Sequence, residues 1–143
     1  MESHALSSHY SSLGQSSFTP WWAAPSLQAA LAQEMLTHLL PSPTSRVVDL
    51  GAGSGTFAAL VHRQAGLTVP LTCVDPSKDM LATAGEVEGL DTLCQSGEEW
   101  AAGGEEGDTD RVIVKAAVHH FDKEKMADTL AGIRCIHTLQ RFE

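Results

Sequence analysis

The sequence is poor in basic residues. Its 143 residues include 9 Lys and Arg against 18 Asp and Glu, which gives a formal net charge of −9. A chain this acidic does not attract phosphate backbones or anionic membrane surfaces, and its few basic residues are scattered rather than clustered. We therefore expect neither nucleic acid nor a membrane as a partner.

Cysteine and long apolar runs are also scarce. Cys73, Cys94 and Cys135 form no C-x-x-C pair and are odd in number, so we expect reduced thiols, with Cys73 and Cys94 buried in strands. No apolar run reaches the roughly 18 residues of a membrane span, and the N-terminus shows neither a signal nor a transit pattern. These absences predict a cytoplasmic protein.

The composition that remains is that of one globular domain, with 43% apolar residues. Residues 1–17 contain seven serines and few large apolar groups, which predicts a loosely held segment before a domain over residues 18–143. Trp21 and Trp22 then either pack onto the sheet or contribute to a substrate pocket.

A helix is expected to open at Pro25 and to end before Pro41. Its apolar positions recur at helical spacing: Leu27, Leu31, Met35, Leu36, Leu39 and Leu40.

The rest of the chain is organised around residues 47–58, Val-Val-Asp-Leu-Gly-Ala-Gly-Ser-Gly-Thr-Phe-Ala. This is the order of a strand, a tight turn and a helix at a nucleotide site, where glycines let the backbone approach a ligand. A dinucleotide turn reads G-x-G-x-x-G, whereas here Gly51, Gly53 and Gly55 alternate with single residues and Asp49 precedes them. Because an acid repels a pyrophosphate, Asp49 favours a ligand with an ammonium group. The alternative is an ordinary turn that uses glycine for geometry alone.

A second acid follows after one strand–helix–strand unit. The strand predicted over residues 71–74 ends on Asp75, about twenty residues beyond the glycine turn. A carboxylate at this strand tip can accept hydrogen bonds from both hydroxyls of a ribose. Pro76 would start the next helix, and Asp75 could also be its N-cap, which is compatible with ribose binding.

These two motifs resemble those of class I S-adenosylmethionine-dependent methyltransferases. D-x-G-x-G-x-G at residues 49–55 is similar to the first motif of that family, and residues 75–81 are similar to the second. The resemblance implies S-adenosyl-L-methionine as the cofactor, with Asp49 near the methionine moiety and Met80 against the adenine ring. The cofactor-binding residues implied by these motifs are Asp49, Gly51, Ala52, Gly53, Gly55, Asp75, Pro76 and Met80.

A third segment follows a short strand predicted over residues 91–94. In the family this point often reads G-D-A-E and recognises the adenine edge; here Ser96 takes the aspartate position, Gly97 the small one and Glu98 the glutamate. A serine hydroxyl can still bond the adenine amine, but without a charge the contact is weaker. The alternative is a solvated acidic helix start, favoured by the helix dipole.

A flexible acidic loop is predicted over residues 101–108, and a fourth strand and its exit over residues 111–118. The strand leads to His119 and His120, which resembles the branch called methyltransferase type 11. No Asn-Pro-Pro-Tyr or Asp-Pro-Pro-Tyr follows, which disfavours the base-amine and glutamine-amide methylating branches. Lys115 is unexpected near the end of a central strand, because a buried ammonium is costly unless it reaches the pocket or a carboxylate.

The histidine pair contains the candidates for proton chemistry at the carboxyl edge of the sheet. Either His119 or His120 has the pKa range of a general base for methyl transfer. The alternative is a pair that caps the next helix or packs near the cofactor without taking a proton. We expect no metal site, because neighbouring histidines diverge and no further ligand cluster is visible.

The resemblance implies the fold class α/β: a Rossmann-like three-layer αβα domain with a mostly parallel sheet in the order 3-2-1-4. After a helix predicted over residues 122–139, the family continues with strands that this chain lacks, so we expect a truncated form with strand four as an exposed edge. The expected activity is methyl transfer from S-adenosylmethionine to an unidentified small-molecule acceptor. The alternative is a non-catalytic form that binds the cofactor weakly, or docks on a protein partner or a second copy through that edge. The glycine spacing and Asp49 disfavour a nicotinamide-dependent oxidoreductase.

Overall fold

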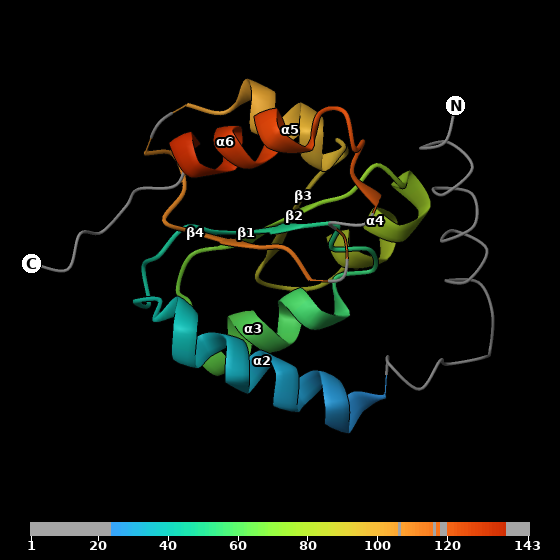
Figure 1. Ribbon diagram of the computed structural model, residues 1–143. Coiled ribbons are helices and arrows are strands. Elements are labelled where there is room, and N and C mark those ends of the chain that lie inside the picture. Colours follow the sequence, from blue (N-terminus) through green and yellow to red (C-terminus); the bar gives the residue numbers. More distant parts are fainter. Residues whose placement is uncertain (1–23, 106, 116, 118–119, 137–143) are drawn as a thin grey trace, which may run out of the picture.

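The computed structural model describes residues 24–136, except for residues 106, 116, 118 and 119. Predictions for the N-terminal segment, for Trp21 and Trp22 and for His119 lie outside the described residues. The described strands form one parallel sheet in the order β3-β2-β1-β4 (Figure 1). The strands are β1 (Val47–Leu50), β2 (Leu71–Val74), β3 (Leu90–Leu93) and β4 (Arg111–Ile113). The predicted fold class and strand order are confirmed.

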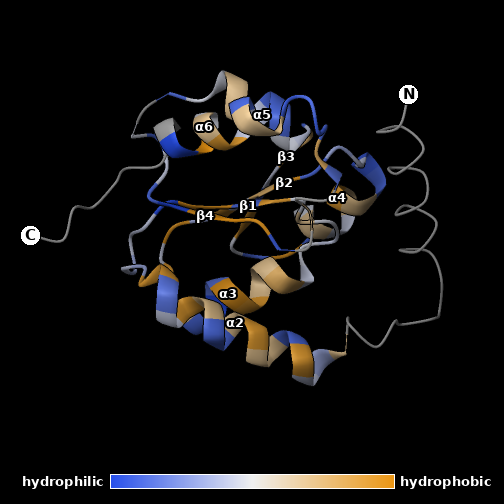
Figure 2. Ribbon diagram, viewed as in Figure 1, coloured by the Kyte–Doolittle hydropathy of each residue, from blue (hydrophilic) through white to orange (hydrophobic). Residues whose placement is uncertain are grey.

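Helices cover both faces of this sheet. The two sets lie on opposite sides in Figure 1, and the hydropathy colours of Figure 2 place the most apolar segments between them. One face carries α2 (Pro25–Leu39), α3 (Thr56–Ala65) and α4 (Lys78–Gly85), and the other carries α5 (Gly97–Gly103) and α6 (Met126–Ile136). Because both faces are covered, every residue of β1 is buried.

Strand alternation divides the core between the two faces. Val48 and Leu50 of β1 pack with Trp100 of α5, whereas Val47 packs with the α3 side chains. Asp49 lies on the α3 face as well, opposite Cys73 of β2 in the register. Burial, reinforced by the nearby Asp49, Asp75 and Asp91 carboxylates, raises the pKa of the Cys73 thiol to about 12, so this cysteine is the inert thiol that the sequence predicts.

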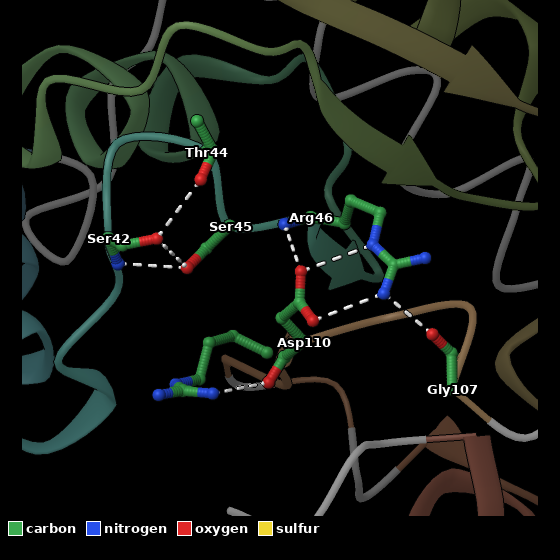
Figure 3. A network of polar contacts seen from close by, with 7 residues as sticks. Ser42, Thr44, Ser45, Arg46, Gly107 and Asp110 are labelled. Atoms are coloured by element: carbon green, nitrogen blue, oxygen red, sulfur yellow. Dashed lines mark hydrogen bonds and ion pairs between the residues drawn. The ribbon is translucent and has the colours of Figure 1, made fainter.

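A polar network joins β1 to β4 at the amino edge of the sheet (Figure 3). Arg46 donates to Asp110 from its backbone N–H (2.7 Å), from Nε (3.1 Å) and from Nη2 (3.1 Å), and Nη2 also donates to the Gly107 carbonyl (2.6 Å). These bonds hold the pKa of Asp110 below its ordinary range. Arg111 Nε donates to the Leu39 carbonyl, which satisfies the last turn of α2. These contacts hold the starts of β1 and β4 together, at the end of the strands opposite the predicted site.

Within the range predicted for the fourth strand and its exit, β4 ends at Ile113 because β1, the strand it pairs with, turns away at Gly51. One predicted boundary is wrong for a tertiary reason. The first part of the predicted loop over residues 101–108 is helical, because Ser96 caps α5 and Trp100 is buried against the sheet.

The smaller boundary differences follow from local caps. α4 begins at Lys78 rather than at Pro76, because Ser77 is its N-cap. α6 spans Met126–Ile136, within the predicted range. The predicted C-cap of α3 at Gly66 is confirmed.

Two predictions of burial are also wrong. Cys94 lies one residue beyond β3 and is exposed, with its Sγ 3.7 Å from the Pro76 carbonyl oxygen. In the first half of α2 the buried face differs from the predicted one, since Gln28 and Ala32 are buried while Leu27 and Leu31 are each 37% exposed. The second half packs against the core through the predicted residues Met35, Leu36 and Leu39.

β4 pairs with β1 alone among the described residues, so it forms an edge of the described sheet. No helix in the described part of the chain is both long and apolar enough to cross a membrane.

Candidate functional site

The site forms where β1 and β2 end side by side. The N–H groups of Gly51 and Ala52 both donate to the Val74 carbonyl, at 2.8 Å and 3.1 Å, so the turn after β1 folds against the end of β2. Gly51, Gly53 and Gly55 have φ values of 75°, 59° and 78°, which L side chains adopt only with strain. The alternating glycines are therefore required by this turn.

Asp75 links this turn to the second strand. Its Oδ2 accepts the Gly53 N–H at 3.0 Å, and its Oδ1 accepts the Ser77 N–H at 2.9 Å. The N-cap of α4 is Ser77, whose Oγ accepts the Met80 N–H at 3.4 Å, so the capping alternative for Asp75 is wrong. A carboxylate has about four acceptor positions, so Asp75 keeps capacity for the two donors of a ribose.

The remaining residues of the second motif border the same turn. Met80 projects from α4 so that its Cε would lie 3.2 Å from a Cβ built on Gly53. Pro76 is exposed beside Asp75. The turn, Asp75 and Met80 thus come together as the sequence predicts.

Asp49 is the charged residue at the base of the site. Its side chain is 2% exposed in the middle of β1. Burial raises its pKa to about 7; Lys115 opposes this shift and the Asp75 carboxylate adds to it. Without a ligand, Asp49 therefore exchanges its proton near neutral pH, and a cation placed against it would favour the ionised form.

The Ser96–Glu98 segment is engaged in protein contacts. Ser96 Oγ accepts the Glu99 N–H at 3.1 Å as the N-cap of α5, and Glu98 Oε1 accepts the Asp122 N–H at 2.8 Å. A Cβ on Gly97 would lie 2.6 Å from the Phe121 ring. These contacts fit the predicted helix start and show why residue 97 is small.

Of the predicted histidine pair, only His120 lies among the described residues. It is partly buried, and its N–H donates to the Ala117 carbonyl at 3.0 Å. Ala117 in turn faces the glycine turn, since a Cβ on Gly51 would lie 2.6 Å from its Cβ. The segment after β4 therefore packs against the turn. No cluster of three or more His, Cys, Asp and Glu side chains suited to a metal ion occurs within the described residues.

Sequence reasoning missed Gln28 and left Lys115 undecided. Lys115 Nζ lies 3.2 Å from Gln28 Oε1 and 4.7 Å from the centroid of the Phe57 ring. Several polar residues flank the apolar positions of this helix, so no local signal distinguishes Gln28. The contact with Lys115 accompanies the burial of Gln28 in the first half of α2.

The chain's relation to known proteins follows from its sequence as well. The family model described as a methyltransferase domain matches residues 47–137, which is more than half of the chain. The chain belongs to the methyltransferase domain family. The match begins at β1 and includes the glycine turn, Asp75 and the segment after β4, so the recognition made from the motifs is confirmed. The finer assignment to the type 11 branch stays a prediction.

Individual methyltransferases agree with this assignment. An uncharacterized methyltransferase of Staphylococcus carnosus is 32% identical over 97 residues, which are 68% of this chain and 44% of that protein. A magnesium protoporphyrin IX methyltransferase of Synechocystis with bound S-adenosylmethionine has a TM-score of 0.69 at 15% identity, over 96% of this chain and 72% of that one. A SAM-dependent methyltransferase of Archaeoglobus fulgidus has a TM-score of 0.60 at 22% identity, over 77% of this chain and 48% of that one.

The structural likenesses show the fold. The Synechocystis methyltransferase contains bound S-adenosylmethionine, and the Archaeoglobus fulgidus methyltransferase is SAM-dependent. The chain spans less than half the length of the Staphylococcus carnosus protein.

The buried carboxyl group of this methyltransferase domain predicts a pH-dependent stability. Between about pH 4 and pH 7 the folded protein holds a proton on Asp49 that the unfolded chain releases, so the stabilisation present at acidic pH is lost as the pH rises through 7. Asparagine does not titrate. We therefore expect Asp49→Asn to gain free energy of unfolding relative to the wild type from pH 5 to pH 8, by on the order of 2 kcal/mol. Urea unfolding without cofactor at pH 5, 6.5 and 8 measures this; a difference that stays constant with pH contradicts it.

Proposed function

We propose that this chain binds S-adenosylmethionine at the carboxyl edge of its sheet and transfers the methyl group to a small-molecule acceptor. The observation that carries the proposal is the 3.0 Å hydrogen bond from the Gly53 N–H to Asp75 Oδ2. This bond joins the glycine turn to the acidic second motif, 22 residues away in sequence, at the edge where open α/β sheets bind ligands. Membership of the methyltransferase domain family supports this assignment.

Each part of the site has a proposed role in holding the cofactor. Asp75 accepts hydrogen bonds from the ribose hydroxyls, and Asp49 provides the negative charge for the ammonium group of the methionine moiety. Gly51, Ala52, Gly53 and Gly55 keep the turn free of side-chain bulk, and Pro76 and Met80 border the adenine ring. The set proposed to bind the cofactor is thus the predicted one, completed by Ser96, Gly97 and Glu98.

The Ser96–Glu98 segment has a reduced part in this proposal. Ser96 Oγ and Glu98 Oε1 already accept backbone N–H groups. A serine hydroxyl that accepts one bond still has its own O–H to donate, so Ser96 can bond a nitrogen of the adenine edge. Glu98 then acts by holding the segment at Asp122.

The cofactor supplies a methyl group on a sulfonium, which is already activated as a leaving group. The protein then has to align the acceptor and, for some acceptors, take up its proton. We propose His119 or His120 for the second task, because both follow β4 in the sequence and histidine titrates near neutral pH. No residue of this chain is proposed to bind a metal.

The surroundings of the reaction are also proposals. The net charge of −9 supports a small-molecule acceptor over nucleic acid and a cytoplasmic location over a membrane surface. The one-sided pairing of β4 among the described residues supports the second candidate, a protein partner or second copy at that edge.

Calorimetric titration of the chain with S-adenosylhomocysteine and with NADH at pH 8 tests the proposal. We expect saturable, one-to-one binding of S-adenosylhomocysteine in the micromolar range and none of NADH, because Asp49 repels a pyrophosphate. Binding of NADH alone would identify a nicotinamide site instead. If a chain shown by circular dichroism to be folded binds neither ligand, the proposal is wrong.

A further inference from the structure

The residue that follows β4 into the site is a lysine in an unusual environment. Lys115 lies two positions beyond Ile113, the last residue of β4. Its Nζ is 3.2 Å from Gln28 Oε1 on α2 and 4.7 Å from the centroid of the Phe57 ring on α3. The side chain is partly buried, and burial lowers the pKa of its ammonium group. Two helices thus hold a lysine where a hydrophobic residue would pack at lower cost.

Neither of these two contacts neutralises the lysine. The amide of Gln28 accepts a hydrogen bond and the ring of Phe57 offers its negative face, but both groups are uncharged. The opposite charge that acts on Lys115 comes from Asp49, which raises its pKa against the effect of burial. The effect is mutual, because Lys115 in turn lowers the pKa of Asp49 and so favours its ionised form.

The groups around Asp49 determine how strongly its ionised form depends on Lys115. From β2 it is faced by the Cys73 thiol and by the Asp75 carboxylate, which disfavours a second negative charge. Lys115 reaches the same face of the sheet from the end of β4: Ile113 pairs with Asp49 in the register, and Lys115 Nζ lies over the Phe57 ring of α3. Within the described part of the chain, the positive charge of Lys115 opposes the effect of burial on the pKa of Asp49.

We propose that Lys115 is a positioning residue of the cofactor site, whose ammonium group, held by Gln28 and Phe57, favours the charged form of the Asp49 carboxylate, which receives the ammonium group of the cofactor. This inference rests on the proposed function. Lys115 has two opposite effects on binding: it favours the charged carboxylate, and it repels the incoming cation. Below neutral pH the first effect dominates, because Asp49 is only partly ionised there and would be ionised to a smaller fraction without Lys115. At higher pH Asp49 is charged without help, so the lysine no longer assists.

The test is the affinity for S-adenosylhomocysteine of the wild type, Lys115→Met, Lys115→Arg and Gln28→Leu at pH 6.5 and pH 8.5. We expect Lys115→Met to bind about fivefold to tenfold more weakly than the wild type at pH 6.5 and within about twofold of it at pH 8.5. Lys115→Arg keeps the charge and should restore most of the affinity at pH 6.5. Gln28→Leu removes the hydrogen bond but not the charge, so any loss should be similar at both pH values.

Two outcomes would overturn the inference. An equal loss in Lys115→Met at both pH values would show a structural role alone, and unchanged binding at pH 6.5 would show no role.

A measurement without ligand separates this inference from the proposed function. The titration of the Asp49 carboxyl carbon, followed by NMR in the free protein, should move to higher pH in Lys115→Met and not in Gln28→Leu. A wild type that fails to bind S-adenosylhomocysteine but shows this shift would overturn the function and retain the charge coupling. The absence of the shift, with binding intact, would overturn the inference alone.

Discussion

Replacing Asp75 with asparagine should weaken the binding of S-adenosylhomocysteine by about a hundredfold or more. The carboxylate accepts the Gly53 N–H on Oδ2 and the Ser77 N–H on Oδ1, and we propose that it also accepts two ribose hydroxyls. Asparagine has one acceptor oxygen, so its NH₂ group must face one of these donors. Hydrogen bonds to a charged group contribute about 1.5–3 kcal/mol each, and the loss of two of them gives the stated factor.

Two controls make the Asp75 result specific. Asp91→Asn removes an equal charge from an exposed position on the neighbouring strand β3 and should leave the affinity within about twofold. The melting temperature of Asp75→Asn reports whether the turn survives, since both backbone donors lose part of their acceptor. An unchanged affinity in a folded Asp75→Asn variant would place the ribose elsewhere and remove the second motif from the site.

The sequence predicts this half of the site well because its signals are local. The turn needs a positive φ at Gly51, Gly53 and Gly55, which is why these glycines alternate with other residues. The whole pattern lies within five consecutive residues. Asp75 follows after one strand–helix–strand unit, whose length fixes its distance from the turn. The order of the strands is implied by the resemblance of these motifs to the methyltransferase family rather than by any local signal.

The other half depends on contacts between distant segments. Lys115 contacts Gln28, which is 87 residues away in sequence. A short stretch of sequence therefore predicts neither the burial of Gln28 in α2 nor the partner of the lysine. Ala101 of α5 likewise packs against a distant segment, because a Cβ on Gly132 of α6 would collide with the Ala101 carbonyl. The prediction that Cys94 is buried in a strand is wrong because β3 ends at Leu93, one residue earlier, where the chain turns toward Ser96.

The position of Asp49 connects the two halves. A carboxylate in the middle of a covered strand conflicts with the apolar pattern on either side of it, and such conflicts mark functional sites. Its burial lowers the stability of the free protein at neutral pH, because the charged form is poorly solvated there. A cationic cofactor removes that penalty on binding, so the folded protein and the cofactor should stabilise each other most strongly above pH 7.

Gly55→Ala should lower the stability of the protein strongly, because core residues lie close to the added methyl group on two sides. Its Cβ would lie 2.8 Å from Ala84 Cβ and 2.9 Å from Leu90 Cδ1, in addition to the strain of φ 78°. Strain and overpacking together cost about 3 kcal/mol, or roughly 10 °C in melting temperature. Gly66→Ala is the matched control, because it has φ 62° and no atom within 4 Å of the new Cβ, so only strain of about 1 kcal/mol remains. Equal losses in the two variants, measured by thermal unfolding without cofactor, would show that Gly55 serves backbone conformation alone; a larger loss in Gly55→Ala assigns this motif glycine to the packing of α4 and β3 against the turn.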